Sequence, residues 1–313
     1  MVSGAGAVPG RRALEATRPR YGEKVIKAFL AACAGLSVVV TTAIVVSLVV
    51  PTIGFFREVS IVEFFTQTQW APAFSRPSFG VWPIVVGTLM VVFFSLIVAV
   101  PVGLACAIYL SEYAPRRLRK LIKPTLEVLA GIPTVAIGLF AVHLLRPLAG
   151  KLLPFLDWRT PFSTGVAGVA VGLLIVPLVT SVSDDALRSV PASLREGAYA
   201  LGSSKLKVTL RVVFPAAISG IVAAVVLGTS RAVGETMVVL LAAGAGNPNL
   251  SFNPVEGVQT MTAYIGGRAT GDIAAGTIVY DTIFAVGTLL FAMTLTMNVL
   301  AIRLVRRFRE VYD

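Results

Sequence analysis

The stretch EGAYALGSSKLKVTLRVVFP, residues 196–215, decides how this chain is organised. It is polar and basic, and it lies between two long apolar runs. Charged side chains are costly inside the hydrocarbon core of a membrane, so this stretch is expected at a membrane face. The apolar runs on either side of it then cross the bilayer.

The composition is that of a membrane protein, because hydrophobic residues make up 56% of the 313 residues. A helix needs roughly 20 apolar residues to cross a bilayer. Continuous rather than alternating apolar runs exclude a transmembrane β-barrel. The sequence therefore predicts an all-α polytopic membrane protein. Its six transmembrane helices are expected at about 25–53, 81–111, 124–148, 164–187, 213–243 and 273–302.

The distribution of positive charge predicts the orientation. With the N-terminus in the cytoplasm, 20 of the 27 Lys and Arg residues fall in cytoplasmic segments and six in outer loops. The remaining cation, Arg231, lies inside a span. By the positive-inside rule, both termini are cytoplasmic. The net charge of +11 then needs no nucleic-acid partner.

These spans divide the chain into five parts. They are a basic cytoplasmic tail (1–24), the first transmembrane helix (25–53), an extracytoplasmic loop (54–80), a core with five further spans (81–305) and a cytoplasmic tail (306–313). The aromatic residues of loop 54–80 form either an interfacial belt or a surface for an extracytoplasmic partner. The Gly-rich loop 244–272 is either a gate or a flexible connection.

The segment 189–200 predicts a short amphipathic helix at the cytoplasmic face. Leu194, Ala198 and Leu201 are three or four residues apart and would share one side of it. Ser193 and Glu196 have the spacing of a capping box at its start. Gly202 would end the helix, and Pro215 would open the fifth span. This helix either lies on lipid or docks in a groove of a soluble partner.

The spacing of Glu196, Ala198, Gly202 and Pro215 resembles the EAA loop of type I ABC importer permeases. In that family the loop is the docking element for an ATPase subunit. The chain departs from the usual pattern at Gly197, where Ala is common, and at Phe214, where Leu is common. The resemblance implies a coupling loop at 188–215. Its expected ATPase-coupling residues are Arg195, Glu196, Gly197, Ala198, Gly202 and Pro215.

The stretch SRAVGETM, residues 230–237, places charged residues within the fifth span. Arg231 and Glu235 are four residues apart, so on a continuous helix they share a face and can pair. Such a pair either locks helices together or forms an anion site, because the planar Arg guanidinium matches oxyanions. In the second case, Thr229, Ser230 and Thr236 would add hydroxyl groups to the substrate path.

Four stretches together resemble the permease of the high-affinity phosphate ABC importer, in its PstC-type rather than its PstA-type form. They are YLSEYAPRRLRK (109–120), LAGIPT (129–134), SDDALRSVP (183–191) and SRAVGETM. The resemblance implies a MetI-like bundle in the bacterial plasma (inner) membrane. It also implies a role for Arg231 and Glu235 in phosphate passage. The implied partners are a second permease, two ATPase subunits and an extracytoplasmic phosphate-binding protein.

The residues offer no catalytic machinery of their own. No GxxxxGK[ST] nucleotide loop is present, and one His and two Cys residues leave no metal cluster. We therefore expect no enzyme activity and no cofactor on this chain, with ATP and Mg²⁺ on the partner ATPase. His143 is expected at the outer interface, and Asp281 either lines the path or pairs with Arg231.

Three other interpretations remain open from the residues. The same bundle would serve a PstA-type sibling, or a permease for sulfate or molybdate. An ion-coupled secondary transporter predicts an inverted repeat, which the sequence does not display. A membrane scaffold without a transport role leaves Arg231 inside the bilayer without a purpose.

Overall fold

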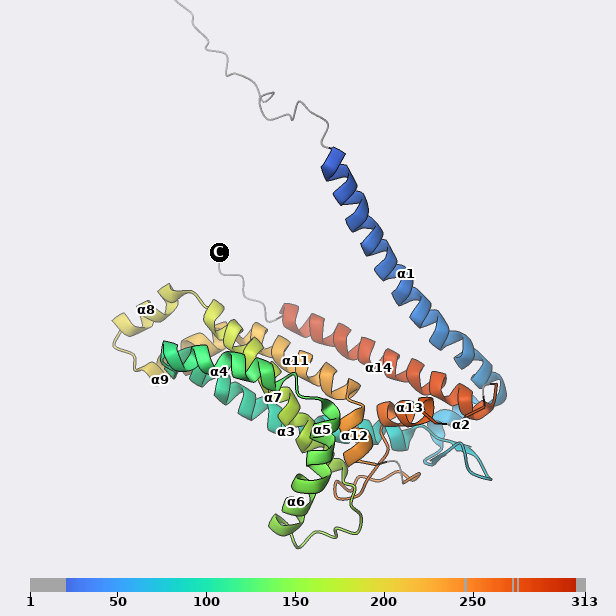
Figure 1. The fold of residues 1–313 in the computed structure, drawn as a ribbon. Coiled ribbons are helices and arrows are strands. Elements are labelled where there is room, and N and C mark those ends of the chain that lie inside the picture. Colours follow the sequence, from blue (N-terminus) through green and yellow to red (C-terminus); the bar gives the residue numbers. More distant parts are fainter. Residues whose placement is uncertain (1–20, 245–246, 272, 275, 308–313) are drawn as a thin grey trace, which may run out of the picture. The chain divides into compact units, whose positions relative to one another are not determined.

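The computed structural model describes residues 21–244, 247–271, 273–274 and 276–307 (Figure 1). Contacts between residues divide the chain into two units, residues 1–47 and 48–313. The predicted tails 1–24 and 306–313 fall outside the described residues, except for residues 21–24 and 306–307, which are helical. The first unit therefore contributes only the beginning of α1 (Tyr21–Glu58) to the description.

Helix α1 contains the predicted first span. Val25, Phe29 and Val38 expose more than half of their surfaces, and the helix is apolar on all sides. An apolar helix with exposed side chains is suited to contact with lipid.

The second unit holds the remaining helices and one small antiparallel hairpin, in which Trp70 pairs with Phe79. Its elements up to the third span are α2 (Ile61–Thr66), β1 (Trp70–Ala71), β2 (Ser78–Phe79), α3 (Trp82–Ile108), the π-helical turn η2 (Tyr109–Tyr113), α4 (Arg116–Leu129), α5 (Thr134–Phe140), the π-helical turn η3 (Ala141–Leu145) and α6 (Arg146–Leu152). The later elements are α7 (Thr164–Ser189), α8 (Ala192–Ala200), α9 (Lys205–Val208), the π-helical turn η4 (Thr209–Val213), α10 (Phe214–Ala216), α11 (Ile218–Gly234), α12 (Met237–Ala242), α13 (Met261–Ala269) and α14 (Ile278–Arg307).

The predicted helical membrane fold is confirmed. Within the described residues, five helical segments are long and apolar enough to cross a membrane: Gly22–Glu58, Trp82–Tyr113, Thr134–Leu152, Thr164–Ser189 and Ile278–Arg303. A bent pair, Lys205–Ala216 and Ile218–Gly234, makes the sixth span if it is counted as one.

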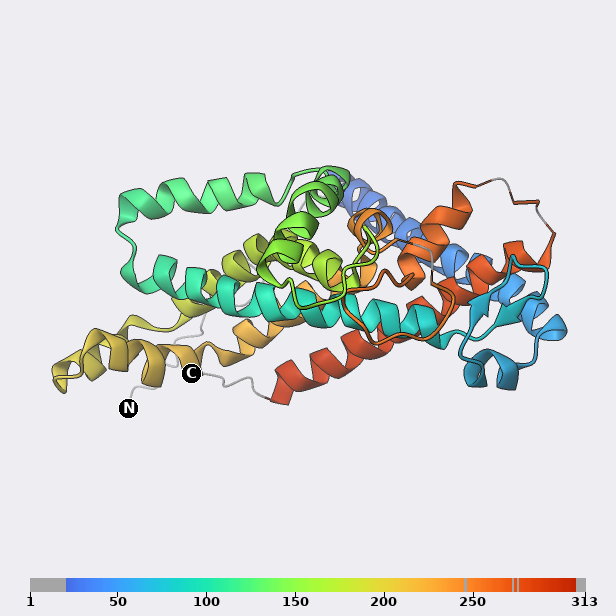
Figure 2. The same cartoon turned by 90° about the horizontal axis from the view of Figure 1, so that it is seen from below.

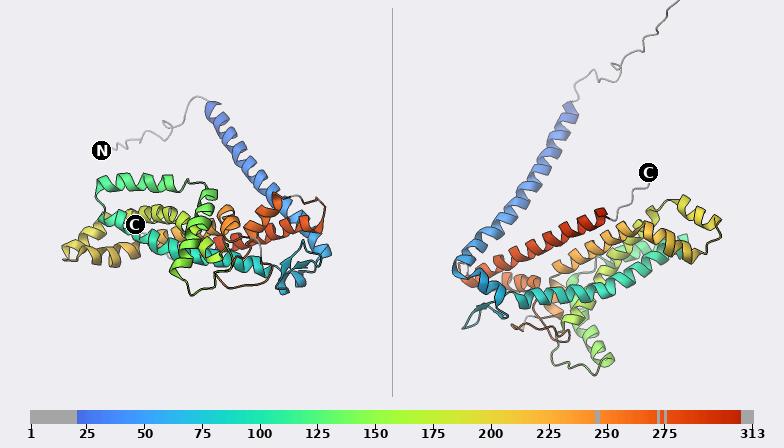
Figure 3. Two further views of the ribbon diagram at one scale, coloured as in Figure 1. Left: turned by 60° about the horizontal axis from the view of Figure 1, so that its bottom comes forward. Right: turned by 180° about the vertical axis from the view of Figure 1, so that it is seen from behind.

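The centre of the second unit is the pair α3 and α7, with α11 packed on α7 (Figures 1 and 2). Glycine lets the two backbones approach closely. A Cβ atom added at Gly168 would lie 2.5 Å from Phe94 Cβ, and one at Gly172 would lie 2.7 Å from the Ser95 carbonyl oxygen. Helix α8 and the β-hairpin lie at opposite ends of this unit (Figures 2 and 3). We call these the α8 end and the hairpin end.

The predicted third span, 124–148, begins too early. Helix α4 is a separate amphipathic helix with no buried residue, and it ends at Leu129. The Gly131 and Ile132 N–H groups bond back to the last turn of α4, and Pro133 is extended and has no N–H to continue the helix. The apolar span therefore starts at Thr134.

The predicted fifth span, 213–243, is not one helix. It bends by 70° between Ala216 and Ile218, just after Pro215, which supplies no N–H group. It breaks again at Glu235, whose backbone is extended, before the short helix α12. The span is therefore interrupted twice, and its second break falls among the predicted path residues.

The aromatic residues of loop 54–80 mostly form a packed core, which neither sequence interpretation predicts. Phe55, Phe64, Trp70 and Phe79 are buried and meet edge to face. Tyr264 of α13 joins them, with its ring centroid 5.0 Å from that of Trp70. The loop therefore folds with α13 into a compact hairpin end.

The close approach of α3 and α7 predicts a strong effect for a single methyl group. Gly172→Ala should lower the free energy of unfolding by about 1–3 kcal/mol, because the new Cβ meets the Ser95 backbone. Gly35→Ala in α1 is the matched control, since its Cβ would meet nothing within 4 Å. Titration with SDS in mixed micelles measures the free energy of unfolding of both variants. Equal stability of the two variants would contradict the close packing.

Candidate coupling helix and anion path

The predicted helix at the α8 end is present, with a later start. Helix α8 begins at Ala192 after Pro191, and no side chain caps it. The predicted capping box of Ser193 and Glu196 is therefore wrong, because Ser193 already lies inside the helix. Val190, which precedes Pro191, has an extended backbone and separates α7 from α8, as is usual for a residue before proline.

The predicted end of the helix at Gly202 is confirmed. Gly202 has φ +77°, a conformation that other residues avoid. The Ser203 N–H bonds to the Ala198 carbonyl, and the Gly202 N–H bonds to the Tyr199 carbonyl. This is the Schellman arrangement, which satisfies the last carbonyl groups of a helix.

One face of α8 packs against the ends of the spans. Leu194 and Ala198 contact a buried cluster that includes Leu187, Val190 and Val208. Leu201, predicted on the same face, is instead 88% exposed, because it follows the last helical residue. The inward face is therefore made by the two residues inside the helix.

Arg195 fixes α8 to two other elements. Its Nη1 lies 2.6 Å from Glu112 Oε1 in η2, and its Nη2 donates to the Leu187 carbonyl of α7 over 2.6 Å. The Glu112 side chain is only 5% exposed. Carbonyl groups at a helix C-terminus lack intrahelical partners and favour a cation. Arg195 therefore ties α8 to the ends of both α3 and α7.

The other predicted coupling residues divide into two groups. Glu196 and Gly197 are exposed, and a Cβ at Gly197 would meet nothing within 4 Å. Ala198 packs inward, Gly202 ends the helix, and Pro215 lies at the bend of the fifth span. The open surface of α8 is thus centred on Glu196.

A second ion-pair cluster lies at the α8 end, and its acidic residues were not singled out from the sequence. Asp184 of α7 is fully buried and lies 2.5 Å from Arg119 of α4. Lys123 bridges Asp184 at 3.6 Å and Asp185 at 2.5 Å. Arg119 and Lys123 are one helical turn apart on α4 and share a face, and this spacing could have predicted a basic surface that pairs with acidic residues. This cluster holds α4 to α7.

The predicted pairing of Arg231 with Glu235 is wrong. Helix α11 ends at Gly234, so the two residues do not share a helix, and no ion pair joins them although both are described. Glu235 is 8% exposed and caps α12, because its carboxylate accepts the Val238 N–H. Its carbonyl accepts the Thr262 hydroxyl over 2.7 Å. Glu235 therefore stabilises the break itself.

Within the described residues no hydrogen bond or ion pair engages the Arg231 side chain, whereas the nearby hydroxyl groups are engaged. Thr229 donates to the Val225 carbonyl and Thr236 to the Gly234 carbonyl. Ser230 donates to Asn298 Oδ1 of α14. A hydroxyl has one proton, so these groups have none left for an anion. Arg231 is exposed, and it is the predicted path residue that can donate to a substrate.

The two remaining titratable candidates lie apart from Arg231. His143 is exposed in η3, at the middle of the span Thr134–Leu152 rather than at its outer end. Asp281 lies in the first turn of α14, where its carboxylate is 3.9 Å from the position of a Cβ on Gly54. It forms no ion pair with Arg231, and both residues are described. The open question of Asp281 as a partner of Arg231 is thereby answered.

Comparison with known proteins gives a consistent set of relatives. The family model for the binding-protein-dependent transport system inner membrane component matches residues 99–310. The Probable ABC transporter permease protein YqgH of Bacillus subtilis is 34% identical over 90% of this chain and 89% of its own length. The phosphate transport system permease protein PstC 1 of Mycobacterium tuberculosis is 34% identical over 79% of this chain and 82% of its own.

Solved structures share the fold. A bacterial ABC transporter involved in the import of the acidic polysaccharide alginate aligns with TM-score 0.61 and 16% identity, over 93% of this chain and 100% of its own. The inward-facing MetNI methionine ABC transporter aligns with TM-score 0.52 and 19% identity, over 74% and 95%. At these identities the likeness concerns the fold alone.

The Arg195 contacts predict that α8 loosens when they are removed. Arg195→Gln should cost about 1.5–3 kcal/mol, because it leaves the buried Glu112 carboxylate without its charged donor. Hydrogen exchange of the α8 amides should become faster. The control is Lys207→Gln, an exposed cation in the same loop. The double variant Glu112→Arg/Arg195→Glu should recover part of the loss. Unchanged exchange in Arg195→Gln would show that α8 is held by other contacts.

Proposed function

Because this chain belongs to the family of binding-protein-dependent transport system inner membrane components, we propose that it is the phosphate-conducting permease subunit of an ATP-driven importer. It is a multi-pass membrane protein with the fold of a type I ABC importer permease. Phosphate as the substrate is supported by the relatives that are named phosphate permeases and that match most of this chain.

The observation that carries the proposal is the attachment of α8. Arg195 and the Leu194 face tie this helix to α3 and α7, and Glu196 remains exposed. A soluble protein that binds the Glu196 surface would therefore move the ends of two spans together with α8. We assign this docking role to an ATPase subunit.

Membership of the family implies an ATPase and a substrate-binding protein as partners. We propose a complex of this chain, a second permease of the PstA type, two ATPase subunits and an extracytoplasmic phosphate-binding protein. ATP and Mg²⁺ would bind to the ATPase subunits, so this chain would need no cofactor and would catalyse no reaction itself.

Arg231 is proposed as the phosphate contact within the membrane. A charged side chain inside a span is costly unless it faces a water-filled path or a partner. The guanidinium offers two parallel donors that match phosphate oxygens. Because Glu235 is engaged with α12, it does not compete with phosphate for Arg231. Its proposed role is to keep the helix broken beside the path.

In the transport cycle, the binding protein delivers phosphate to the pair of permeases. ATP binding closes the ATPase dimer and displaces α8. The spans then rock between inward- and outward-facing states, and phosphate passes Arg231. Hydrolysis resets the complex. A sulfate or molybdate permease would use the same bundle, but the names of the relatives favour phosphate.

Phosphate uptake into proteoliposomes tests both proposed roles. Glu196→Lys should abolish uptake and release the ATPase, because it reverses the exposed charge of α8. Arg231→Gln should reduce uptake at least about tenfold while the ATPase stays bound, since a charge-assisted hydrogen bond to phosphate is lost. Uptake and subunit stoichiometry are read from the same preparations.

Two control variants sharpen this test. Glu127→Lys reverses an exposed charge on α4 and should leave the ATPase bound. Arg231→Lys keeps the charge but loses the planar pair of donors, and it should transport less than the wild type. Full uptake by Arg231→Gln would overturn the path, and uptake that ignores ATP would overturn the importer assignment.

A further inference from the structure

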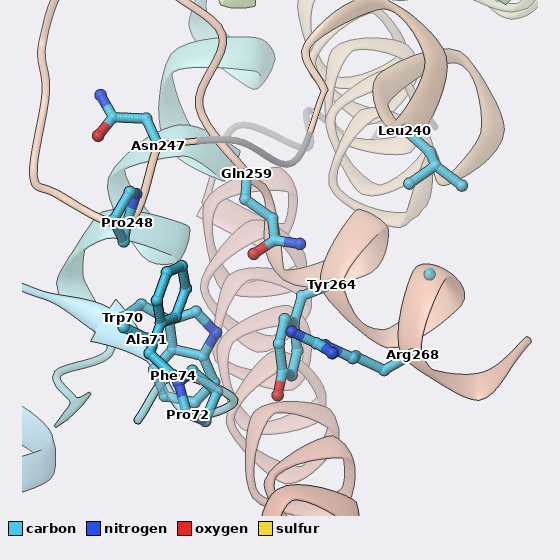
Figure 4. A pocket seen from close by; sticks show the side chains of 11 residues that line it. Trp70, Ala71, Pro72, Phe74, Leu240, Asn247, Pro248, Gln259, Tyr264 and Arg268 are labelled. Atoms are coloured by element: carbon cyan, nitrogen blue, oxygen red, sulfur yellow. The ribbon is translucent and has the colours of Figure 1, made fainter. Parts of the chain in front are cut away.

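A small cavity of about 230 Å³ lies at the hairpin end, outside the site described above. The hairpin residues Trp70 and Phe74 form one side, Pro248 another, and α13 a third with Tyr264 and Arg268 (Figure 4). Its volume is below the range of roughly 300–1,000 Å³ that is usual for drug-sized ligands, so an occupant would be small.

The walls of the cavity are joined by hydrogen bonds. The Trp70 backbone N–H donates to the Pro248 carbonyl over 2.8 Å, and the Leu250 backbone N–H donates to the Thr68 carbonyl over 3.1 Å. Gln69 Nε2 donates to Asn249 Oδ1 over 2.8 Å. The hairpin and the segment after Asn247 are therefore held together, and the cavity is preformed.

Trp70 supplies a buried donor without a protein partner. The residue is 3% exposed, and its indole Nε1 has no hydrogen-bond acceptor within the described residues. In Figure 4 this nitrogen lies on the edge of the indole that faces Tyr264, and the two rings meet edge to face with centroids 5.0 Å apart. A buried donor left without an acceptor costs free energy, so its position indicates an acceptor that enters the cavity.

The remaining polar groups give the cavity one positive charge. The Arg268 guanidinium lies 5.7 Å from the centre of the Tyr264 ring, and Gln259 and Asn247 add carboxamide groups. The lining residues include no carboxylate. Burial raises the pKa of Tyr264 above its ordinary value of 10.0, and its hydroxyl bonds to Thr282. The phenol therefore stays neutral and does not cancel Arg268.

We propose that this cavity binds a small oxyanion of the phosphate class. An oxyanion accepts hydrogen bonds from the guanidinium, the indole N–H and the carboxamide groups together, whereas a cation would meet Arg268 without a compensating carboxylate. The ligand oxygen that accepts the Trp70 indole N–H satisfies a buried donor that has no acceptor within the described residues.

The position of the cavity connects it to the broken fifth span. Leu240 of α12 lines it, and α13 contacts the break through the bond from Thr262 to the Glu235 carbonyl. An anion bound here would lie at the hairpin end, beside α13, before it enters the proposed path at Arg231. The sequence from cavity to path rests on the proposed function, whereas binding of the anion to the cavity does not.

The proposed occupant is free inorganic phosphate, and the alternative to exclude is a carboxylate presented by the extracytoplasmic binding protein. ¹⁹F NMR of the assembled importer in nanodiscs distinguishes them. The chain carries 5-fluorotryptophan, and Trp70→Phe identifies the Trp70 resonance. Inorganic phosphate is titrated without ATP and without binding protein, and phosphate-free binding protein is added in a separate arm.

The Trp70 resonance should shift saturably when inorganic phosphate is added. Arg268→Gln should weaken that response at least about tenfold, because it removes the charged donor. The matched control Lys151→Gln, an exposed cation of α6, should not change it. Unmoved resonances of Trp82 and Trp158 in Arg268→Gln would show that the variant is folded. A response to binding protein alone would identify a protein carboxylate as the occupant, and it would overturn the proposal.

No response to phosphate, or a response that survives Arg268→Gln, would likewise overturn the proposal. Arg231→Gln separates this site from the transport path, because it should reduce uptake at least about tenfold without changing the Trp70 titration. Loss of the Trp70 response in Arg231→Gln would show that the resonance reports the path, and it would also contradict a separate site.

Discussion

A backbone group that leaves its helix inside a membrane finds no water to bond with, and this constraint governs where the spans of this protein can break. At the most consequential break, the Glu235 carboxylate accepts the Val238 N–H and the Glu235 carbonyl accepts the Thr262 hydroxyl. The break is therefore built from paired groups. It separates α11 from α12, frees Arg231 from its expected partner, and connects the span to α13. One buried residue and its hydrogen bonds thus hold the break in place.

At the α8 end, buried ion pairs attach short helices to the ends of the spans. Arg195 joins α8 to Glu112 and Leu187, and Arg119 joins α4 to the buried Asp184. Removing one member of such a pair leaves a buried charge without compensation, so each pair resists separation while both members are present. Helices α4 and α8 therefore follow the ends of α3 and α7, and a force applied at Glu196 reaches the spans.

Features that depend on neighbouring residues were predictable from the sequence. The apolar runs predict the spans, and Gly202 predicts the end of α8, because both depend on neighbouring residues. The misplaced features depend on residues that are distant in the sequence. Arg195 and Glu112 are 83 residues apart, and Thr262 reaches Glu235 across 27. Continuous hydropathy also conceals the breaks at Pro133 and Glu235, since apolar residues continue on both sides. The aromatic loop looked like a membrane belt because composition does not distinguish an interface from a core.

The most direct test of the central claim, that α8 and α7 move as one body, is a pair of distances. Spin labels at Ser193→Cys in α8 and Leu173→Cys in α7, with Cys33 and Cys106 replaced by Ser, report the attachment by double electron–electron resonance. A second pair joins Ser193→Cys to the corresponding helix of the second permease. On ATP binding, the distance within the chain should stay constant while the distance between the permeases shortens. A change in the Ser193–Leu173 distance would show that α8 moves independently of the spans, and it would contradict the account.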